Sequence, residues 1–206
     1  MGVSIPAIAR RDATGDLPDS ESGQTRGAGR LARGPSAIQL GHCVSRGDEL
    51  CGDGPYSDFI KFIAYHDILG PRIRSWYLAR LQRTVLSELT LKESLDLYYD
   101  IFGYDKTKEP GVDELATTGF SPEYVLRETK RSVASAEGKT KIYPGIGFDV
   151  PWGSNPMPAD PEKVYECVKQ AFAGGGAGIV VSREYEEMRL ANLKAVGRAM
   201  RELERG

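Results

Sequence analysis

The first 55 residues contain no aromatic residue and no lysine, and every Phe, Tyr and Trp of this 206-residue chain lies at Tyr56 or beyond. Without bulky apolar side chains, a segment cannot bury enough surface to offset the entropy lost on ordering. We therefore predict that residues 1–55 form a disordered N-terminal arm. The alternative is that this segment is not natural coding sequence, because its composition changes abruptly at residue 56.

Cysteine is scarce as well: the chain has three, Cys43, Cys51 and Cys167, and their spacing is not that of metal ligands. The odd count favours reduced thiols over a disulfide framework. Two glycine-rich stretches, GIGFDV and GGGAG, lack the spacing or the position of a nucleotide-binding loop. We therefore expect neither a metal nor a cofactor.

Long apolar runs are also missing. No window approaches the ~20 apolar residues of a membrane span, and no apolar stretch follows Arg10 and Arg11 as it would in an export signal. The sequence predicts no membrane partner and a cytoplasmic location by default, with export a question for a longer parent protein. The net charge of −2 argues against a nucleic-acid partner. Because the net charge argues against a nucleic-acid surface, four arginines are interpreted as a solvated helix face: Arg72, Arg74, Arg80 and Arg83.

The carboxyl-terminal stretch alternates strands with helices. β-Branched and aromatic residues predict a strand over 141–150, and a short apolar run predicts a buried strand over 177–181. Between them, Asp160 and Pro161 favour a helix start, because Asp caps free amides and Pro fits the first helical position. A last helix is predicted with the apolar stripe Leu193, Val196, Met200 and Leu203. Two strands joined by a helix form a parallel crossover.

The upstream half of the domain is richer in helices. Residues 58–67 predict another buried strand that ends in the polar residues Tyr65, His66 and Asp67, followed by a break at Pro71 and a helix over 76–86. Thr90 and Glu93 have the spacing of a capping box, so a helix is expected to begin there and to end at Gly103. A further helix is expected over 122–136. The fold class is therefore α/β, with one domain over residues 56–206 and a helical insertion at about 68–120.

Three phrases of the chain carry a resemblance. DFIKFIAYHDILGPRIRSWYLARLQRTVL, KIYPGIGFDVP and AGIVVSREYEEMRLANLKAVGRAMREL resemble the carboxyl-terminal part of bacterial glycoside-hydrolase-like proteins with (β/α)8 barrels. The resemblance spans about Tyr56 to Glu204 and implies the last three strand–helix units of a TIM-like barrel. It also implies a carbohydrate-directed hydrolase. Because the first five strands are absent from this sequence, the chain is expected to be a catalytically incomplete fragment.

The candidate site residues are those expected at the ends of the strands, where ligands gather in such folds. Glycoside hydrolysis uses two carboxyl groups, and the resemblance favours Asp149 and Glu184 as the catalytic pair. Polar and aromatic side chains nearby are the expected substrate-binding residues: Tyr65, His66, Asp67, Trp152 and Arg183. Each also has a structural interpretation, since strand-end carboxylates cap amides and acidic residues favour the first turn of a helix.

Two other functions remain open from the sequence. One is a non-enzymatic α/β module that associates with itself or another chain through an open strand edge. The other is a barrel isomerase or lyase with His66 as its base, because histidine titrates near neutral pH. The leading hypothesis is a glycoside-hydrolase-like domain with a carbohydrate partner.

Overall fold

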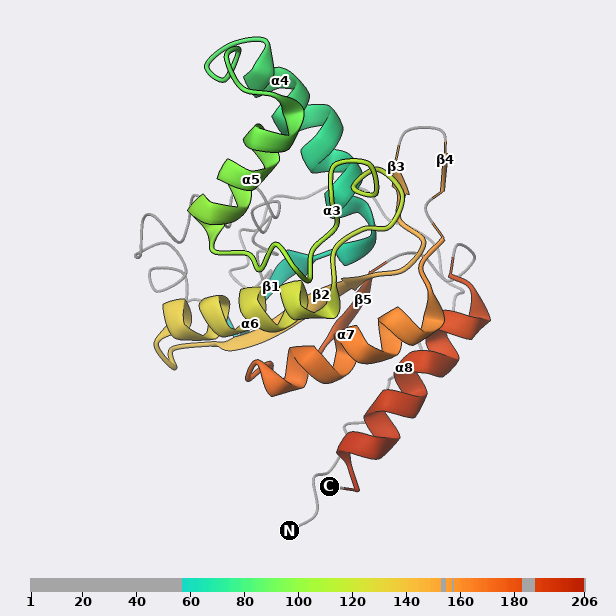
Figure 1. The fold of residues 1–206 in the computed structure, drawn as a ribbon. Coiled ribbons are helices and arrows are strands. Elements are labelled where there is room, and N and C mark those ends of the chain that lie inside the picture. The colour runs from blue at the N-terminus through green and yellow to red at the C-terminus, as the bar shows by residue number, and fades with distance from the viewer. Residues whose placement is uncertain (1–56, 153–154, 157, 183–187, 206) are drawn as a thin grey trace, which may run out of the picture. The chain divides into compact units, whose positions relative to one another are not determined.

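The computed structural model describes residues 57–152, 155–156, 158–182 and 188–205. Three strands form a parallel sheet in the order β1 (Phe59–Ala64), β2 (Lys141–Gly147) and β5 (Val180–Ser182). In its register Phe59 lies opposite Lys141, and Gly147 lies opposite Ser182. The predicted α/β class with parallel strands is confirmed (Figure 1). The predicted N-terminal arm falls outside the described residues.

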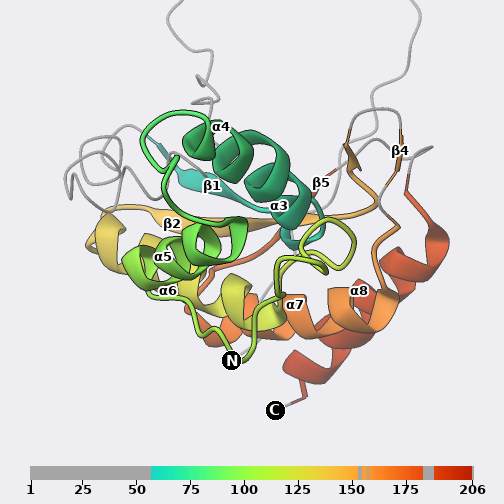
Figure 2. The same cartoon turned by 45° about the horizontal axis from the view of Figure 1, so that its top comes forward.

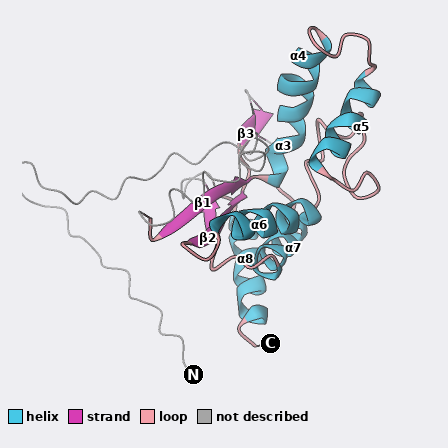
Figure 3. Cartoon of the chain, turned by 90° about the vertical axis from the view of Figure 1, so that its left-hand side faces the viewer, coloured by secondary structure: helices cyan, strands magenta, loops and turns pink. Residues whose placement is uncertain are grey.

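The sheet packs against three helices. α6 (Pro122–Ala136) contacts β1 and β2, α7 (Pro161–Ala173) contacts β2 and α6, and α8 (Leu190–Leu203) packs on α7. Figures 2 and 3 show these helices on the same side of the sheet. The strand residues that alternate toward them are buried, and they build the core together with the helices: Ile60, Phe62, Ala64, Ile142 and Ile146.

A helical insertion separates β1 from β2, as the sequence predicts. It consists of α3 (His66–Arg72), the π-helix η2 (Ile73–Leu78), α4 (Ala79–Gln82) and α5 (Leu91–Phe102). The predicted capping box is confirmed, because the Glu93 amide donates to Thr90 Oγ1 while the Glu93 carboxylate accepts from the Thr90 amide. Gly103 ends α5 in the left-handed conformation, with φ of 66°.

The predicted break at Pro71 is wrong. The helix begins at His66 and passes through Pro71 into η2 and α4 without interruption. A proline inside a helix costs about 3 kcal/mol, but each apolar side chain that is fully buried contributes about 1.5–3 kcal/mol. Four of these side chains from this helical run are buried: Ile68, Leu69, Ile73 and Leu78. Their burial therefore outweighs the cost of the proline.

Other boundaries also differ from the sequence prediction, and the helix predicted over 76–86 ends at Gln82. β2 ends at Gly147 instead of residue 150, and the loop that follows it contains a short antiparallel pair, β3 (Pro151–Trp152) with β4 (Asn155–Pro156). β5 begins at Val180, three residues later than predicted. The stripe predicted for α8 is confirmed in part: Leu193 and Val196 are partly buried against the core, whereas Leu203 is 38% exposed. The fully buried residues of α8 lie beside this stripe: Asn192, Ala195 and Ala199.

None of the described helices is long and apolar enough to cross a membrane.

Candidate site at the carboxyl ends of the strands

The parallel sheet brings the end of β1 next to the end of β2. β1 ends at Ala64, and α3 begins at His66 after Tyr65. Asp67 therefore lies in the first turn of a helix, where the helix dipole favours a negative charge. Its Oδ1 accepts a hydrogen bond from the Ile68 amide at 3.0 Å, and its Oδ2 accepts one from the Val150 amide at 3.3 Å. The second bond joins the two strand ends.

Gly147 allows this approach. A Cβ atom added at Gly147 would lie 2.1 Å from Asp67 Oδ1 and 2.8 Å from its carboxyl carbon. Any side chain on the last residue of β2 would therefore displace the Asp67 carboxyl. Gly147 lies within the strand predicted over 141–150, but its partner Asp67 is about 80 residues away in sequence, so no local pattern identifies it.

Asp67 is 3% exposed, so its side chain is shielded from water. Burial raises the pKa of Asp67 from 3.8 to about 6, against the opposing effect of hydrogen bonds from the Val150 and Ile68 amides. The negative charge of Asp149 raises this pKa further. Asp67 is thus a carboxyl group that carries its proton over much of the mildly acidic range.

Asp149, two residues beyond β2, has surroundings that stabilise its ionised form, in contrast to those of Asp67. Its Oδ2 accepts hydrogen bonds from Arg189 Nε at 2.9 Å and Asn192 Nδ2 at 3.0 Å, and its Oδ1 accepts from Arg189 Nη2 at 2.8 Å and the Ala159 amide at 2.7 Å. Its backbone is left-handed, with φ of 50°, a conformation that Asp tolerates better than most residues. These contacts join the end of β2 to the starts of α7 and α8.

Burial would raise the pKa of Asp149, but the hydrogen bonds from Arg189 and Ala159 and the charge of Arg189 hold it below its usual value. Asp149 is therefore ionised, and four donors engage its two oxygens. This arrangement gives Asp149 the structural role of a clamp. The catalytic role predicted from the sequence stays a prediction.

His66 is buried within the same strand end, with 1% of its surface exposed. Neither ring nitrogen has a hydrogen-bond partner among the described residues. Burial, with a smaller contribution from the positive charge of Lys163, lowers the pKa of His66 from 6.5 to about 3. A neutral imidazole with so low a pKa is a weak base, and a general base must also reach its substrate. The geometry disfavours His66 as the base of an isomerase or lyase.

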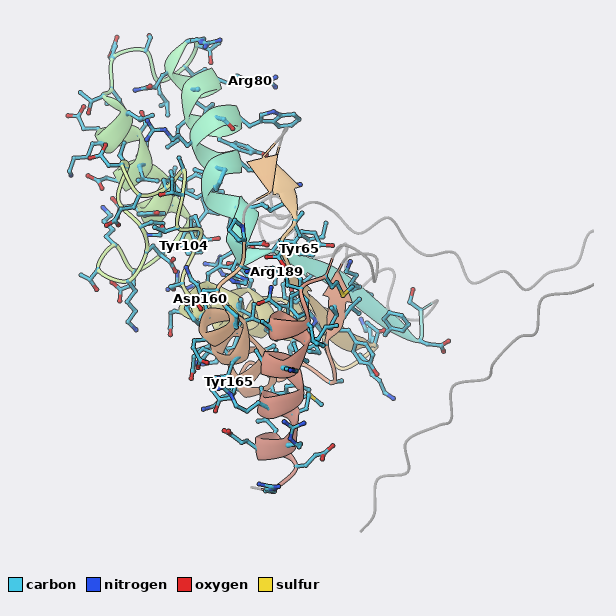
Figure 4. The ribbon with its side chains drawn as sticks, turned by 90° about the vertical axis from the view of Figure 1, so that its right-hand side faces the viewer. Tyr65, Arg80, Tyr104, Asp160, Tyr165 and Arg189 are labelled. Carbon is cyan, nitrogen blue, oxygen red and sulfur yellow. The ribbon has the colours of Figure 1, made fainter. Side chains whose placement is uncertain are left out.

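The remaining predicted site residues are placed less completely. Tyr65 is half-buried, and its hydroxyl accepts a hydrogen bond from Lys61 Nζ at 3.0 Å. Trp152 belongs to β3, and its side chain is outside the described part of the structure. Arg183 and Glu184 also lie outside the described residues. Tyr65 and Arg189 lie at the same end of the sheet (Figure 4).

Two functional residues were missed from the sequence, Arg189 and Asn192. Each carries a signal in hindsight. A cation at the N-cap of a helix, where Arg189 lies, opposes the helix dipole unless an acid pairs with it. An Asn on the buried face of a helix needs a polar partner. In both cases the partner is Asp149. It lies 40 residues from Arg189 in sequence, so no local pattern identifies it.

The described residues contain no group of three or more His, Cys, Asp or Glu side chains that could hold a metal ion. Comparisons with protein-family models, with curated proteins and with solved structures found no match.

Proposed function

We propose that this chain supplies the last three strand–helix units of a glycoside-hydrolase-like (β/α)8 barrel and takes a carbohydrate at the carboxyl ends of β1, β2 and β5. The observation that supports this most is the pair Asp67 and Asp149. Their surroundings move the two pKa values in opposite directions, as happens where one carboxyl donates a proton and another stays ionised.

In this proposal Asp67 is the proton donor, and because Asp67 is 3% exposed, the sugar must displace the Val150 amide from Oδ2 to receive the proton. Its pKa of about 6 keeps it protonated in mildly acidic solution, and its place at the strand end is where barrel enzymes act. Asp149 holds Arg189 and Asn192, so that it shapes the site instead of attacking the sugar. The second carboxyl required for hydrolysis is assigned to Glu184, which follows Ser182, the last residue of β5, by two positions.

The three strands of the sheet form only part of a closed barrel. Hydrolysis by this chain alone is therefore expected to be weak, and binding is expected to be the more robust activity. A complementary polypeptide that adds parallel strands to the sheet would restore hydrolysis.

Release of reducing sugar from a panel of polysaccharides tests the proposal. Asp67→Asn should abolish release, and Glu184→Gln should do the same, whereas Glu186→Gln, two residues further along the sequence, serves as a control that should retain it. The activity of the unaltered chain should fall as pH rises through about 6, because the proton donor is then lost. If the Asp67→Asn variant still releases sugar, with the same pH profile as the unaltered chain, Asp67 is not the proton donor.

A second candidate function, an association module, is favoured by the other face of the sheet. Phe59 and Tyr143 stack there with ring centroids 5.0 Å apart, and Phe59 is 42% exposed. Parallel sheets are normally covered on both faces, so this face suits another polypeptide. Sedimentation over a range of concentrations should then show a dimer that Phe59→Ser disrupts. A monomer at every concentration would exclude self-association.

A further inference from the structure

The helical run after β1 carries three exposed side chains on one face, Trp76, Arg80 and Arg83. We call them the tryptophan–arginine stripe. The Trp76 side chain is 57% exposed, and the guanidinium carbon of Arg80 lies 5.6 Å from the centre of its ring. Arg83 follows Arg80 by three residues, one turn further along. An exposed indole with cations beside it offers a stacking surface and charge together.

Within the part of the chain that the structure describes, no carboxylate neutralises the charges of this stripe. No carboxylate of the described residues pairs with Arg80 or Arg83, and both are exposed. Other arginines of the described part do have acidic partners: Arg131 pairs with Glu128, and Arg198 pairs with Glu162. Two exposed guanidinium groups without a described acidic partner, one of them over an exposed indole, therefore favour an anionic ligand.

The stripe and the candidate site share one helical run, which begins at His66. Arg72, four residues before Trp76, is half-buried, and burial lowers its pKa while the charges of Tyr65 and Asp67 raise it. It therefore lies within electrostatic range of the end of β1. From Arg72 to Arg83 the helical run extends about 16 Å. Figure 4 shows Arg80 well away from Tyr65 along this run. A ligand that contacts both ends must be extended.

We propose that the stripe binds the chain of an anionic polysaccharide whose carboxylate or sulfate groups pair with Arg80 and Arg83 while a sugar ring stacks on Trp76. This inference rests on the proposed carbohydrate function and adds the substrate class. The apolar face of a sugar ring suits the indole, and the planar guanidinium binds carboxylate or sulfate in a bidentate manner. A π-helix at this place is consistent with a binding role, since such helices are frequent at functional sites.

Single-stranded nucleic acid would also present anions and flat rings. The stripe has one exposed aromatic side chain, whereas nucleic-acid surfaces use several on which successive bases stack. The polysaccharide is therefore the favoured ligand.

The experiment measures binding of the full-length chain by titration calorimetry to three polymers: polygalacturonate, a sulfated galactan, and neutral amylose. At least one anionic polymer should bind about tenfold or more tightly than amylose, and the tighter one identifies the anionic group. Trp76→Ala and the double variant Arg80→Ala/Arg83→Ala should each weaken that binding about tenfold. Trp76→Phe should retain most of it, because stacking survives. Arg201→Ala, an exposed arginine on α8, is the matched control and should leave the affinity unchanged.

All variant positions are exposed, so circular dichroism and the thermal midpoint should match those of the unaltered protein. Equal binding of amylose and both anionic polymers, or unchanged affinity in the stripe variants, would overturn this inference and leave the proposed carbohydrate function standing. Binding of none of the three polymers would overturn both. Tighter binding of single-stranded DNA than of either anionic polymer, lost in the stripe variants, would replace the inference with nucleic-acid binding.

Discussion

The guanidinium of Arg189 binds both carboxylate oxygens of Asp149, with Nε 2.9 Å from Oδ2 and Nη2 2.8 Å from Oδ1. Asp149 is 9% exposed, whereas the Arg189 side chain is 48% exposed. The buried partner of this pair therefore depends on a cation that reaches it from the surface. Substituting either residue therefore tests how much the pair stabilises the junction of β2, α7 and α8.

Asp149→Ala should lower the free energy of unfolding by about 2–4 kcal/mol, because the Ala159 amide, the Asn192 amide and Arg189 all lose their acceptor. Asp149→Asn should cost less, since Asn tolerates the left-handed backbone and keeps one acceptor oxygen. Urea unfolding of both variants measures the difference. In a double-mutant cycle with Arg189→Ala, the two losses should not add. Strict additivity would show that the pair does not contribute as a unit.

Asp67 should make the protein less stable as pH rises. Its pKa is 3.8 when unfolded and about 6 when folded, so between these values the folded state binds more protons than the unfolded state. The free energy of unfolding contributed by Asp67 is complete below pH 4, and about 3 kcal/mol of it is lost by pH 7. Subtracting the urea-unfolding profile of Asp67→Asn from that of the unaltered chain isolates this contribution. A flat difference profile would contradict it.

His66 should have the opposite effect over an overlapping range. Its pKa falls from 6.5 to about 3 on folding, so the unfolded state binds more protons. Stability from His66 is present above pH 6.5 and is lost as pH falls toward 3. Between pH 4 and 6 the slopes of Asp67 and His66 therefore oppose each other. Asp67→Asn should reveal stability that rises with pH, and His66→Leu should reveal stability that falls with pH.

The same His66→Leu variant should be as stable as the unaltered chain at pH 7, or more stable. Both ring nitrogens are buried without a hydrogen-bond partner among the described residues, so their removal sacrifices no bond seen in the structure. Denaturant unfolding at pH 7 measures this. A loss above about 2 kcal/mol would show that the imidazole makes an interaction worth more than its desolvation cost.

Gly147→Ala should be strongly destabilising. The added Cβ would lie 2.1 Å from Asp67 Oδ1, and the buried carboxyl can move only by breaking its bonds to the Ile68 and Val150 amides. We expect a loss of about 3 kcal/mol or more. Gly111→Ala is the matched control, because no atom lies within 4 Å of a Cβ at that position. Its midpoint of urea unfolding should stay close to that of the unaltered chain.

The sequence predicted the regular elements well where signals are local. The Thr90 capping box, the Asp160 cap and the glycine after α5 each act within a few residues of the helix they delimit. Parallel pairing followed from the order of strands and helices. Pro71 misled because a local cost was outweighed by burial of side chains against distant partners. Helix propensity alone does not include the free energy gained by burying those side chains.

The candidate site was predicted in part. Asp67 and Asp149 were identified as strand-end residues, but their electrostatic roles depend on contacts that the sequence does not display. Val150 and Gly147 reach Asp67 across about 80 residues of chain, and Arg189 reaches Asp149 across 40. Whether a carboxylate is a free nucleophile or one member of a clamp is decided by such long-range geometry.

The distance along the chain between β1 and β2 also shapes how the protein is made. Residues 65–140 intervene, so β1 leaves the ribosome long before its neighbour in the sheet has been synthesised. α5 and its capping box can form in the meantime. Phe62 and Ile60 of β1 remain unpaired until their partners in β2, Pro144 and Ile142, have been synthesised. Closing so long a loop is a slow step, and during that delay the strand is a target for chaperones and for aggregation.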